Sequence, residues 1–226
     1  MMNIEEVKVG IIGGTGEEGR GLALRWAMAG ARVTIGSRSP ERAKEAADEL
    51  NGVAGHNPIL WADNQAAVAD ADFALLTVPF EHAAATVEGL SGSLKPGAIL
   101  MDITVPVSFE KGRVRYVEPP EGSASEHLQS RLPESIPLVA AFKTEPAHLL
   151  LDPSAALDCD VFVAGDSKEA RARVMEAITF IKGLRPVDAG TIYSARTIER
   201  MTVMLIGINR RRKVKTGRFR VVGLEE

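Results

Sequence analysis

The sequence predicts an α/β fold in which a doubly wound, mostly parallel sheet carries a small C-terminal α+β cap. Over roughly the first 140 residues, short β-branched runs alternate with Ala-rich stretches of helical length, as in parallel strands joined by crossover helices. A glycine-rich turn separates the first strand-like run from the first helix-like stretch. With 45% apolar residues in 226, the chain can bury a substantial core.

The first part of the chain supplies five strands and four helices. The strands are predicted at Val7–Ile12, Arg32–Ile35, Phe73–Val78, Ala98–Ile103 and Leu138–Phe142. The helices are predicted at Arg20–Ala29, Pro40–Leu50, Asn64–Ala69 and Phe80–Leu90. Ser39 before Pro40 makes a plausible N-cap and first-turn pair for the second helix.

The pattern changes between Pro106 and Pro137, where Glu118-Pro119-Pro120-Glu121-Gly122 cannot continue a helix or a central strand. This region is predicted to be an irregular excursion with a short helix at Ala124–Arg131. Later strands are predicted at Asp160–Ala164, Pro186–Ala189 and Arg218–Val222, and later helices at Ser167–Lys182 and Tyr193–Arg211. The later elements are too few for a large independent domain but sufficient for a small cap.

Composition excludes several classes of protein. The 27 Lys and Arg against 30 Asp and Glu give a net charge of −3, which predicts no nucleic-acid or anionic-membrane binding. The single cysteine, Cys159, excludes an intrachain disulfide and a cysteine-built metal site, and we expect no metal. No apolar run is long enough to cross a bilayer, and the N-terminal residues do not resemble a signal peptide. We therefore expect a cytoplasmic protein.

The glycine-rich turn, Gly14-Thr15-Gly16-Glu17-Glu18-Gly19, matches G-x-G-x-x-G in the strand-turn-helix context of a Rossmann-type fold. In such a turn the first glycine permits the tight bend, the second lets a pyrophosphate approach the backbone, and the third lets helix and strand pack closely. The helix N-terminus then offers N–H groups and partial positive charge to the phosphates. The motif predicts a dinucleotide site.

The end of the second strand, about 20 residues after the turn, usually carries an Asp or Glu in NAD-specific folds. Here the chain has Ser37 and Arg38 instead, and Arg42 follows one helical turn later. A guanidinium can bind a 2′-phosphate in bidentate fashion, and the Thr15 hydroxyl could contribute from the turn. The alternative is a solvated surface charge at Arg38, but the motif makes NADP(H) the favoured nucleotide.

Two later strands both end in Thr-Val-Pro, at Thr77-Val78-Pro79 and Thr104-Val105-Pro106. These ends either form a stiff apolar wall for a nicotinamide ring or simply stop strand pairing. Of the histidines, only His82 lies near the expected crevice. The scarcity of catalytic groups favours hydride transfer between two ring cofactors, which depends mainly on face-to-face placement.

The motifs together resemble the F420-dependent NADP oxidoreductases, which move a hydride between NADPH and the deazaflavin coenzyme F420. The resemblance spans nearly the whole chain and rests on Gly13–Arg25, Gly36–Arg38, Leu76–Ala83, Val105–Val107, Gly183–Gly190, Asn209–Lys213 and Gly223–Leu224. It implies NADP phosphates held by Thr15, Ser37, Arg38 and Arg42, and a deazaflavin stacked on the nicotinamide in the cleft. It also implies an NADP-binding domain over residues 1–146 and an acceptor-cleft cap over 147–226.

One segment departs from the family. Where the family has a segment resembling Leu-His-Thr-Ile-Pro, this chain has Phe142-Lys143-Thr144-Glu145-Pro146. Lys143 and Glu145 either satisfy each other or serve a different acceptor, and Lys143 is the residue predicted to reshape the acceptor pocket. Lys143 and His82 are the candidate catalytic residues near that pocket.

Two other readings stay open. An NADPH-dependent reductase could reduce a flavin, a metal complex or a small carbonyl with Lys143 as proton donor. A non-catalytic module could bind NADPH as a sensor. The basic cluster from Arg210 to Arg220 either binds a phosphate-rich ligand or caps a helix end and protects an edge strand. The apolar segment Met201–Ile208 covers either a partner subunit, as in a homodimer, or its own sheet.

Overall fold

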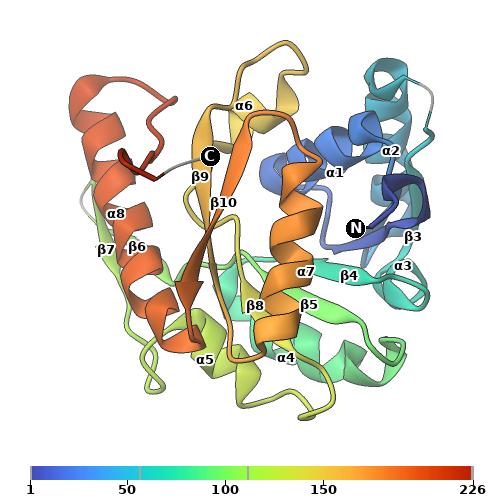
Figure 1. Cartoon of the computed structure of the whole chain (residues 1–226), viewed down its shortest axis with the longest axis horizontal. Coiled ribbons are helices and arrows are strands. Elements are labelled where there is room, and N and C mark those ends of the chain that lie inside the picture. Colours follow the sequence, from blue (N-terminus) through green and yellow to red (C-terminus); the bar gives the residue numbers. More distant parts are fainter. Residues whose placement is uncertain (1, 56, 111, 225–226) are drawn as a thin grey trace.

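One sheet organises the chain in the computed structural model, which describes residues 2–55, 57–110 and 112–224 (Figure 1). Its strands lie in the order β10-β9-β8-β5-β4-β1-β2-β3. Every neighbouring pair is parallel except β8 and β9, which meet antiparallel at Ala140 and Ala164. The strands are β1 Lys8–Ile12, β2 Arg32–Ser37, β3 Leu60–Asp63, β4 Phe73–Leu76, β5 Ile99–Asp102, β8 Leu138–Ala140, β9 Cys159–Ala164 and β10 Leu184–Gly190. The predicted doubly wound α/β fold is confirmed.

Helices cover both faces of this sheet. The helices are α1 Glu17–Ala29, α2 Pro40–Ala54, α3 Asn64–Val68, α4 Phe80–Leu90, α5 Ala124–Gln129, α6 Ala147–Leu151, α7 Lys168–Thr179 and α8 Ala195–Arg212. One buried cluster joins one sheet face to α1, α2, α6 and α7. The second cluster joins the other face to α3, α4, α5 and α8. The sheet therefore separates two cores, and its carboxyl edge between them is where a ligand crevice is expected.

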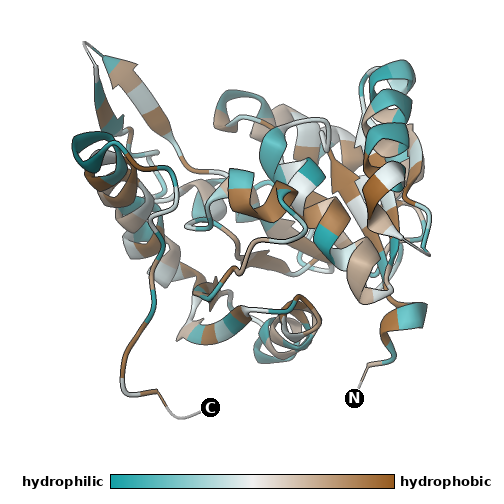
Figure 2. Cartoon of the chain, turned by 90° about the horizontal axis from the view of Figure 1, so that it is seen from above, coloured by the Kyte–Doolittle hydropathy of each residue, from teal (hydrophilic) through white to brown (hydrophobic). Residues whose placement is uncertain are grey.

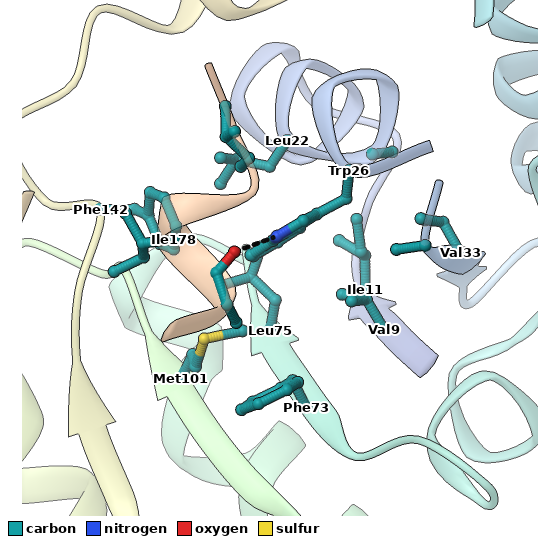
Figure 3. Close-up of a cluster of buried hydrophobic side chains, with 14 of the residues drawn as sticks. Val9, Ile11, Leu22, Trp26, Val33, Phe73, Leu75, Met101, Phe142 and Ile178 are labelled. Carbon is teal, nitrogen blue, oxygen red and sulfur yellow. Dashed lines mark hydrogen bonds between the residues drawn. The ribbon is translucent and has the colours of Figure 1, made fainter. Parts of the chain in front are cut away.

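Trp26 of α1 lies at the centre of the first core (Figure 3). Its indole Nε1 donates a hydrogen bond of 3.2 Å to the carbonyl of Ala177 on α7. Its ring packs edge-on against Phe142, with centroids 5.3 Å apart. Phe142 follows β8 and adopts a left-handed backbone with φ of 54°. This packing holds the strained turn that leads directly into Lys143.

Several predicted elements need correction. The expected irregular excursion contains a two-stranded antiparallel hairpin, β6 Val107–Glu110 and β7 Arg113–Tyr116. The sheet gains an unpredicted edge strand, β3, and the unpredicted helix α6 follows β8. The strand expected at Arg218–Val222 is absent from the described structure, because that segment makes isolated bonds to Asp160 rather than a ladder. Figure 2 shows the stretch after α8 as an extended strap.

The later part of the chain adds to the same sheet. Strands β9 and β10 continue the sheet beside β8, so residues after 147 supply both sheet strands and the covering helix α8. Within α8, Ile198 and Leu205 are buried in the molecule, whereas Met204 and Ile208 are exposed. The apolar segment Met201–Ile208 thus covers its own fold along one side. The division at residues 1–146 and 147–226 stays a prediction.

Candidate functional site

The glycine-rich turn lies between β1 and α1 and is held from three sides. Gly13 has φ of 71°, and its N–H donates to Asn64 Oδ1 at 3.1 Å. The N–H of Gly14 donates to the carbonyl of Gly36 at 3.0 Å. A Cβ on Gly19 would lie 2.8 Å from the Cα of Gly14 and 2.9 Å from Thr77 Oγ1, so only glycine fits there. The turn brings the end of β1 against the start of α1.

Space is left where an anion would approach. A Cβ on Gly16, the N-cap of α1, would meet no atom within 4 Å, and no side chain caps this helix end. The first N–H groups of a helix have no intrahelical partner. The turn therefore presents open backbone donors and the positive end of the α1 dipole to solvent.

A groove of about 550 Å³ runs from this turn to the end of β2. Its lining includes Thr15, Gly16, Ser37, Arg38 and Arg42, the residues predicted for a phosphorylated ribose. Ser37 is buried at the strand end, whereas Arg38 and Arg42 are exposed. Neither guanidinium makes an ion pair or side-chain hydrogen bond with the described residues, so both are available to a dianionic group. His82 lines the far side of the groove.

A second cavity, of about 460 Å³, opens over the carboxyl ends of β4, β5 and β8. Its walls include Thr77, Val78, Pro79 and Val105, together with Glu17 and Glu18 from the first turn of α1. The segment Thr77–Pro79 lines both this cavity and the groove, so the two spaces adjoin. We call the second cavity the acceptor cleft. Pro106 lies outside it and lines a neighbouring hollow with Val105.

Lys143 lies at the acceptor cleft, but its ammonium points into the protein. Nζ lies 2.8 Å from Asp102 Oδ2, 2.5 Å from the carbonyl of Thr104 and 3.2 Å from Glu199 Oε1. The charged side chains of Lys143, Asp102 and Glu199 are all fully buried. Burial alone lowers the pKa of Lys143, but the Asp102 and Glu199 carboxylates together raise it above its usual value. Lys143 therefore pairs with Asp102 and Glu199, and the expected pairing with Glu145 is wrong.

The two carboxylates that hold Lys143 have further partners. Thr104 donates to Asp102 Oδ1 through its backbone N–H and its hydroxyl, and Ser125 donates to Asp102 Oδ2 at 2.6 Å. Glu199 accepts from Tyr116 at 2.7 Å and from the N–H of Ala124 at 3.0 Å. The network joins β5, β7, α5 and α8 beneath the cleft. It positions these elements and leaves no free ammonium proton to donate to a substrate.

Two carboxyl groups in the acceptor cleft have no such cation. Glu145 is buried and accepts hydrogen bonds only from the N–H and hydroxyl of Thr144, both at 3.1 Å, among the residues described. Burial raises the pKa of Glu145 to about 7. Glu18 is half-buried opposite, and burial together with the Glu145 charge raises its pKa well above the usual value.

The outer wall of the cleft comes from the end of the chain. Helix α8 and the strap after it contribute Thr202, Leu205, Ile206, Asn209, Lys215 and Gly217. The Oδ1 atom of Asn209 is buried there without a hydrogen-bond partner in the described structure. The sequence predicts that residues after 147 contribute to the cleft, but it does not identify the residues of this wall, the Glu18 and Glu145 pair or the Lys143 network. Only the position of Asp102 at a strand end could have drawn attention to that network.

The basic cluster is divided between several roles. Arg210, Arg211 and Arg212 form the last turn of α8. Lys215 faces the acceptor cleft, and Arg218 donates to the carbonyl of Asp158. Among the described residues, no group of His, Cys, Asp and Glu side chains is arranged to hold a metal ion. Over the same residues, no helix combines the length and hydropathy that a bilayer span requires.

Comparison with known proteins identifies a family and relatives that match over nearly the whole chain. Residues 8–106 match the family model described as "NADP oxidoreductase coenzyme F420-dependent". An F420-dependent NADP reductase of Methanothermobacter thermautotrophicus is 38% identical over 100% of this chain and 99% of its own length. A second, from Methanothermobacter marburgensis, is 36% identical over 97% of this chain and 100% of its own length.

A solved structure agrees in fold. The crystal structure of a candidate F420-dependent NADP reductase from Arthrobacter sp. FB24 covers 96% of this chain with a TM-score of 0.81 and 24% sequence identity. The alignment includes 99% of that chain. The two chains therefore share a fold over nearly their whole lengths.

Proposed function

Since the chain belongs to the F420-dependent NADP oxidoreductase family, we propose that it transfers a hydride between NADPH and coenzyme F420 within the two adjoining cavities. The observation that carries this assignment is the shared wall at Thr77–Pro79. One side of that wall faces a groove with unpaired guanidinium groups, and the other faces a cavity large enough for a ring. Membership of this family favours F420 as the hydride acceptor over a flavin, a metal complex or a carbonyl substrate.

The groove fits NADP(H). The open backbone at Gly16 and the uncapped α1 N-terminus would receive the pyrophosphate. Ser37, Arg38 and Arg42 would bind the 2′-phosphate, with Thr15 from the turn and His82 at the groove wall. Gly14 and Gly19 would contribute to pyrophosphate binding indirectly. Because they lack side chains, β1 and α1 can approach each other closely and form the turn that binds it.

The acceptor cleft fits the second ring. It is bounded by apolar groups of Val78, Pro79 and Val105. Bound F420 supplies a carbon that accepts or returns the hydride. The protein's own part is to hold two flat rings face to face and to exclude water, since direct transfer depends on closeness and orientation.

The test is the absorbance of F420 on mixing the purified protein with F420 and NADPH, with NADH as the control nucleotide. Loss of the deazaflavin absorbance with NADPH, and a much slower change with NADH, is the expected result. Tight NADPH binding without any loss of F420 absorbance would contradict the acceptor assignment. It would leave the nucleotide assignment intact.

The homodimer and the cytoplasmic setting belong to the proposal as predictions. The exposed Met204 and Ile208 on α8 are the apolar groups that a second copy would cover. Sedimentation velocity of the purified protein checks the dimer. A single species at the monomer mass over a wide concentration range would contradict it.

A further inference from the structure

Two carboxyl groups line the acceptor cleft, and neither forms an ion pair with any residue that the structure describes. Glu145 follows β8 and Glu18 lies in the first turn of α1. Among the described residues, the hydrogen bonds to the Glu145 carboxylate come from its neighbour Thr144. The charge of Glu145 acts on Glu18, so the two carboxyl groups are near enough to interact.

The charges around the pair compensate for it only in part. The Lys143 ammonium lowers the pKa of Glu18, but burial and the Glu145 charge have larger effects in the opposite direction, and Asp102 and Glu199 already pair with this ammonium. Glu17, His148 and Lys215 line the same cleft at its exposed side. Behind Glu145, the thiol of Cys159 on β9 is buried, and burial and the Glu145 charge raise its pKa, so it stays neutral.

Such a pair cannot lose both protons easily. Burial raises the pKa of Glu145 to about 7, and ionised Glu145 in turn raises the pKa of Glu18. Two carboxyl groups close together in a buried site share a proton for this reason. Near neutral pH the pair is thus poised to gain or lose one proton.

The ligand beside the pair changes charge during the reaction. A nicotinamide ring is neutral when reduced and carries one positive charge when oxidised. The groove delivers the nucleotide to Thr77–Pro79, which is also the wall of the cleft that contains Glu18 and Glu145. A nearby positive charge favours the ionised form of a carboxyl group.

We propose that Glu145 and Glu18 are specificity-determining residues for the redox state of the nucleotide: the pair loses a proton when the nicotinamide is oxidised. The inference rests on the proposed function, because it requires NADP(H) in the groove. The hydride carries two electrons from the nicotinamide to the deazaflavin. The proton leaves a carboxyl oxygen of the pair for solvent, and the electron pair of the O–H bond stays on that oxygen. The carboxylate charge so formed compensates for the positive charge gained by the nicotinamide. Ionised carboxylates then favour NADP⁺ over NADPH.

The test measures proton release on nucleotide binding, without F420. Titration calorimetry in two buffers of different protonation enthalpy gives the protons released by NADP⁺ and by NADPH at pH 6, 7 and 8. Near pH 7 we expect NADP⁺ to release up to about half a proton more than NADPH does. Near pH 7 the affinity for NADP⁺ relative to NADPH should therefore rise by up to about threefold per pH unit. The 2′-phosphate is common to both nucleotides, so its own titration cancels in the difference.

Variants locate the effect. Glu145→Gln should abolish the difference in proton release, and Glu18→Gln should reduce it. Glu145→Asp, which keeps a carboxyl group, should retain it in part. Glu45→Gln removes one negative charge from an exposed site on α2 and should behave like the wild type. Circular dichroism confirms that each variant is folded, and NMR of ¹³C-labelled Glu carboxyl groups in the wild type gives the same answer without substitution.

The outcomes separate the inference from the proposed function. If both nucleotides release equal numbers of protons, or if Glu145→Gln keeps the wild-type difference, the inference is wrong while hydride transfer to F420 stands. If neither nucleotide binds, both are wrong. If NADP⁺ releases the extra proton and F420 is not reduced, the pair acts as proposed and only the acceptor assignment fails.

Discussion

Lys143 shows how its surroundings decide what a side chain can do. From sequence it is a candidate proton donor, because it replaces an imidazole at a strand end. Its ammonium instead lies among Asp102, Glu199 and the carbonyl of Thr104. A cation between two buried carboxylates is held tightly in its charged form, which opposes proton transfer to a substrate. The structure favours a positioning role, in which Lys143 fixes the floor of the cleft.

Lys143→Met tests this positioning role. The substitution leaves Asp102 and Glu199 buried without their cation, so we expect the free energy of unfolding to fall by about 3–5 kcal/mol. Adding Asp102→Asn should recover part of the loss by removing one uncompensated charge. Lys44→Met is the matched control, because the exposed pair of Lys44 with Asp48 contributes only about 0.5 kcal/mol. Urea denaturation of the wild type, Lys143→Met, the double variant and Lys44→Met measures the free energies of unfolding. A Lys143→Met variant as stable as Lys44→Met would contradict the positioning role.

Arg38 carries the nucleotide preference in the same groove. Arg38→Glu removes a guanidinium from the 2′-phosphate and adds a repelling charge, so NADPH should bind about 10- to 100-fold more weakly. NADH lacks this phosphate, and its affinity should change little. Arg32→Glu, at the exposed opposite end of β2, is the control for charge reversal. Fluorescence titration gives both dissociation constants, and equal losses for NADPH and NADH would remove Arg38 from the phosphate site.

Among the helices and strands, the sequence predicts those marked by apolar runs or by a glycine-rich turn. The strand-turn-helix around Gly14 to Gly19 follows from a motif whose glycines have steric reasons. The buried strands β1, β4 and β5 follow from uninterrupted apolar runs. By contrast, β3 exposes Leu60 and Trp61 at a sheet edge and has no such pattern.

The failures have related physical causes. The hairpin β6 and β7 contacts α8 by single side chains, such as Arg200 stacked over Tyr116 at 4.4 Å, rather than by a buried strand face. The segment Arg218–Val222 has a strand-like composition, but it makes isolated bonds to Asp158, Asp160 and Arg185 rather than a strand ladder. The groove was predictable because short motifs at three strand ends build it. The acceptor cleft was predicted only in part, at Thr77–Pro79, Val105 and Lys143, because the rest combines α1, β8 and α8, whose proximity no local pattern encodes.

The strap, residues 213–224 after α8, is held to the sheet at Asp160. Buried Asp160 accepts from Arg185 Nε at 2.7 Å and from the N–H of Val221 at 2.6 Å, while its own N–H donates to the carbonyl of Phe219. Asp160→Asn removes the charge that orients these donors, so it should cost about 2–3 kcal/mol and loosen the strap. Because Lys215 and Gly217 line only the acceptor cleft, the KM for F420 should rise several-fold while NADPH affinity stays unchanged.

Hydrogen exchange of the strap amides measures the loosening directly. The Val221 amide should exchange faster in Asp160→Asn than in the wild type. Asp158→Asn alters a neighbouring exposed pair with Arg220 and should have less than about 1 kcal/mol of effect. Two results would contradict this prediction. One is an unchanged exchange rate of the Val221 amide in Asp160→Asn, and the other is a loss of NADPH affinity as large as the rise in the KM for F420.

For the whole molecule, the acidic groups with shifted pKa values divide into two classes with opposite effects on stability. Bonds to Arg185 hold the pKa of buried Asp160 below its usual range, and bonds from Arg171 and the Gly190 N–H lower the pKa of the exposed Asp188. Such groups stabilise the fold above their ordinary pKa and lose that contribution in acid. Glu145 and Glu18 act in the other direction, because their pKa values are raised. The fold therefore combines an acid-sensitive scaffold with a cleft that prefers to be protonated.

The balance predicts a pH profile for the protein without nucleotide. Glu145 has an ordinary pKa of 4.5 and a pKa of about 7 in the folded chain, so the folded state binds more protons between these values. Stability from this group is fully present below about 4.5 and is lost as pH rises to about 7, a total of about 3 kcal/mol. Glu18 adds to the loss in the same direction.

Glu145→Gln isolates this contribution, because the remaining titrating groups are shared with the wild type. At pH 5 the variant should be more stable by less than about 1 kcal/mol, because Glu145 is still protonated in the folded chain although it is already partly ionised in the unfolded chain. At pH 8 the variant should be more stable than the wild type by about 2–3 kcal/mol, because a neutral amide replaces a buried carboxylate. Glu45→Gln should follow the wild type at every pH. Urea denaturation at pH 5, 6, 7 and 8 gives the four-point profile for each protein, and parallel profiles for wild type and Glu145→Gln would show that Glu145 ionises as an exposed acid does.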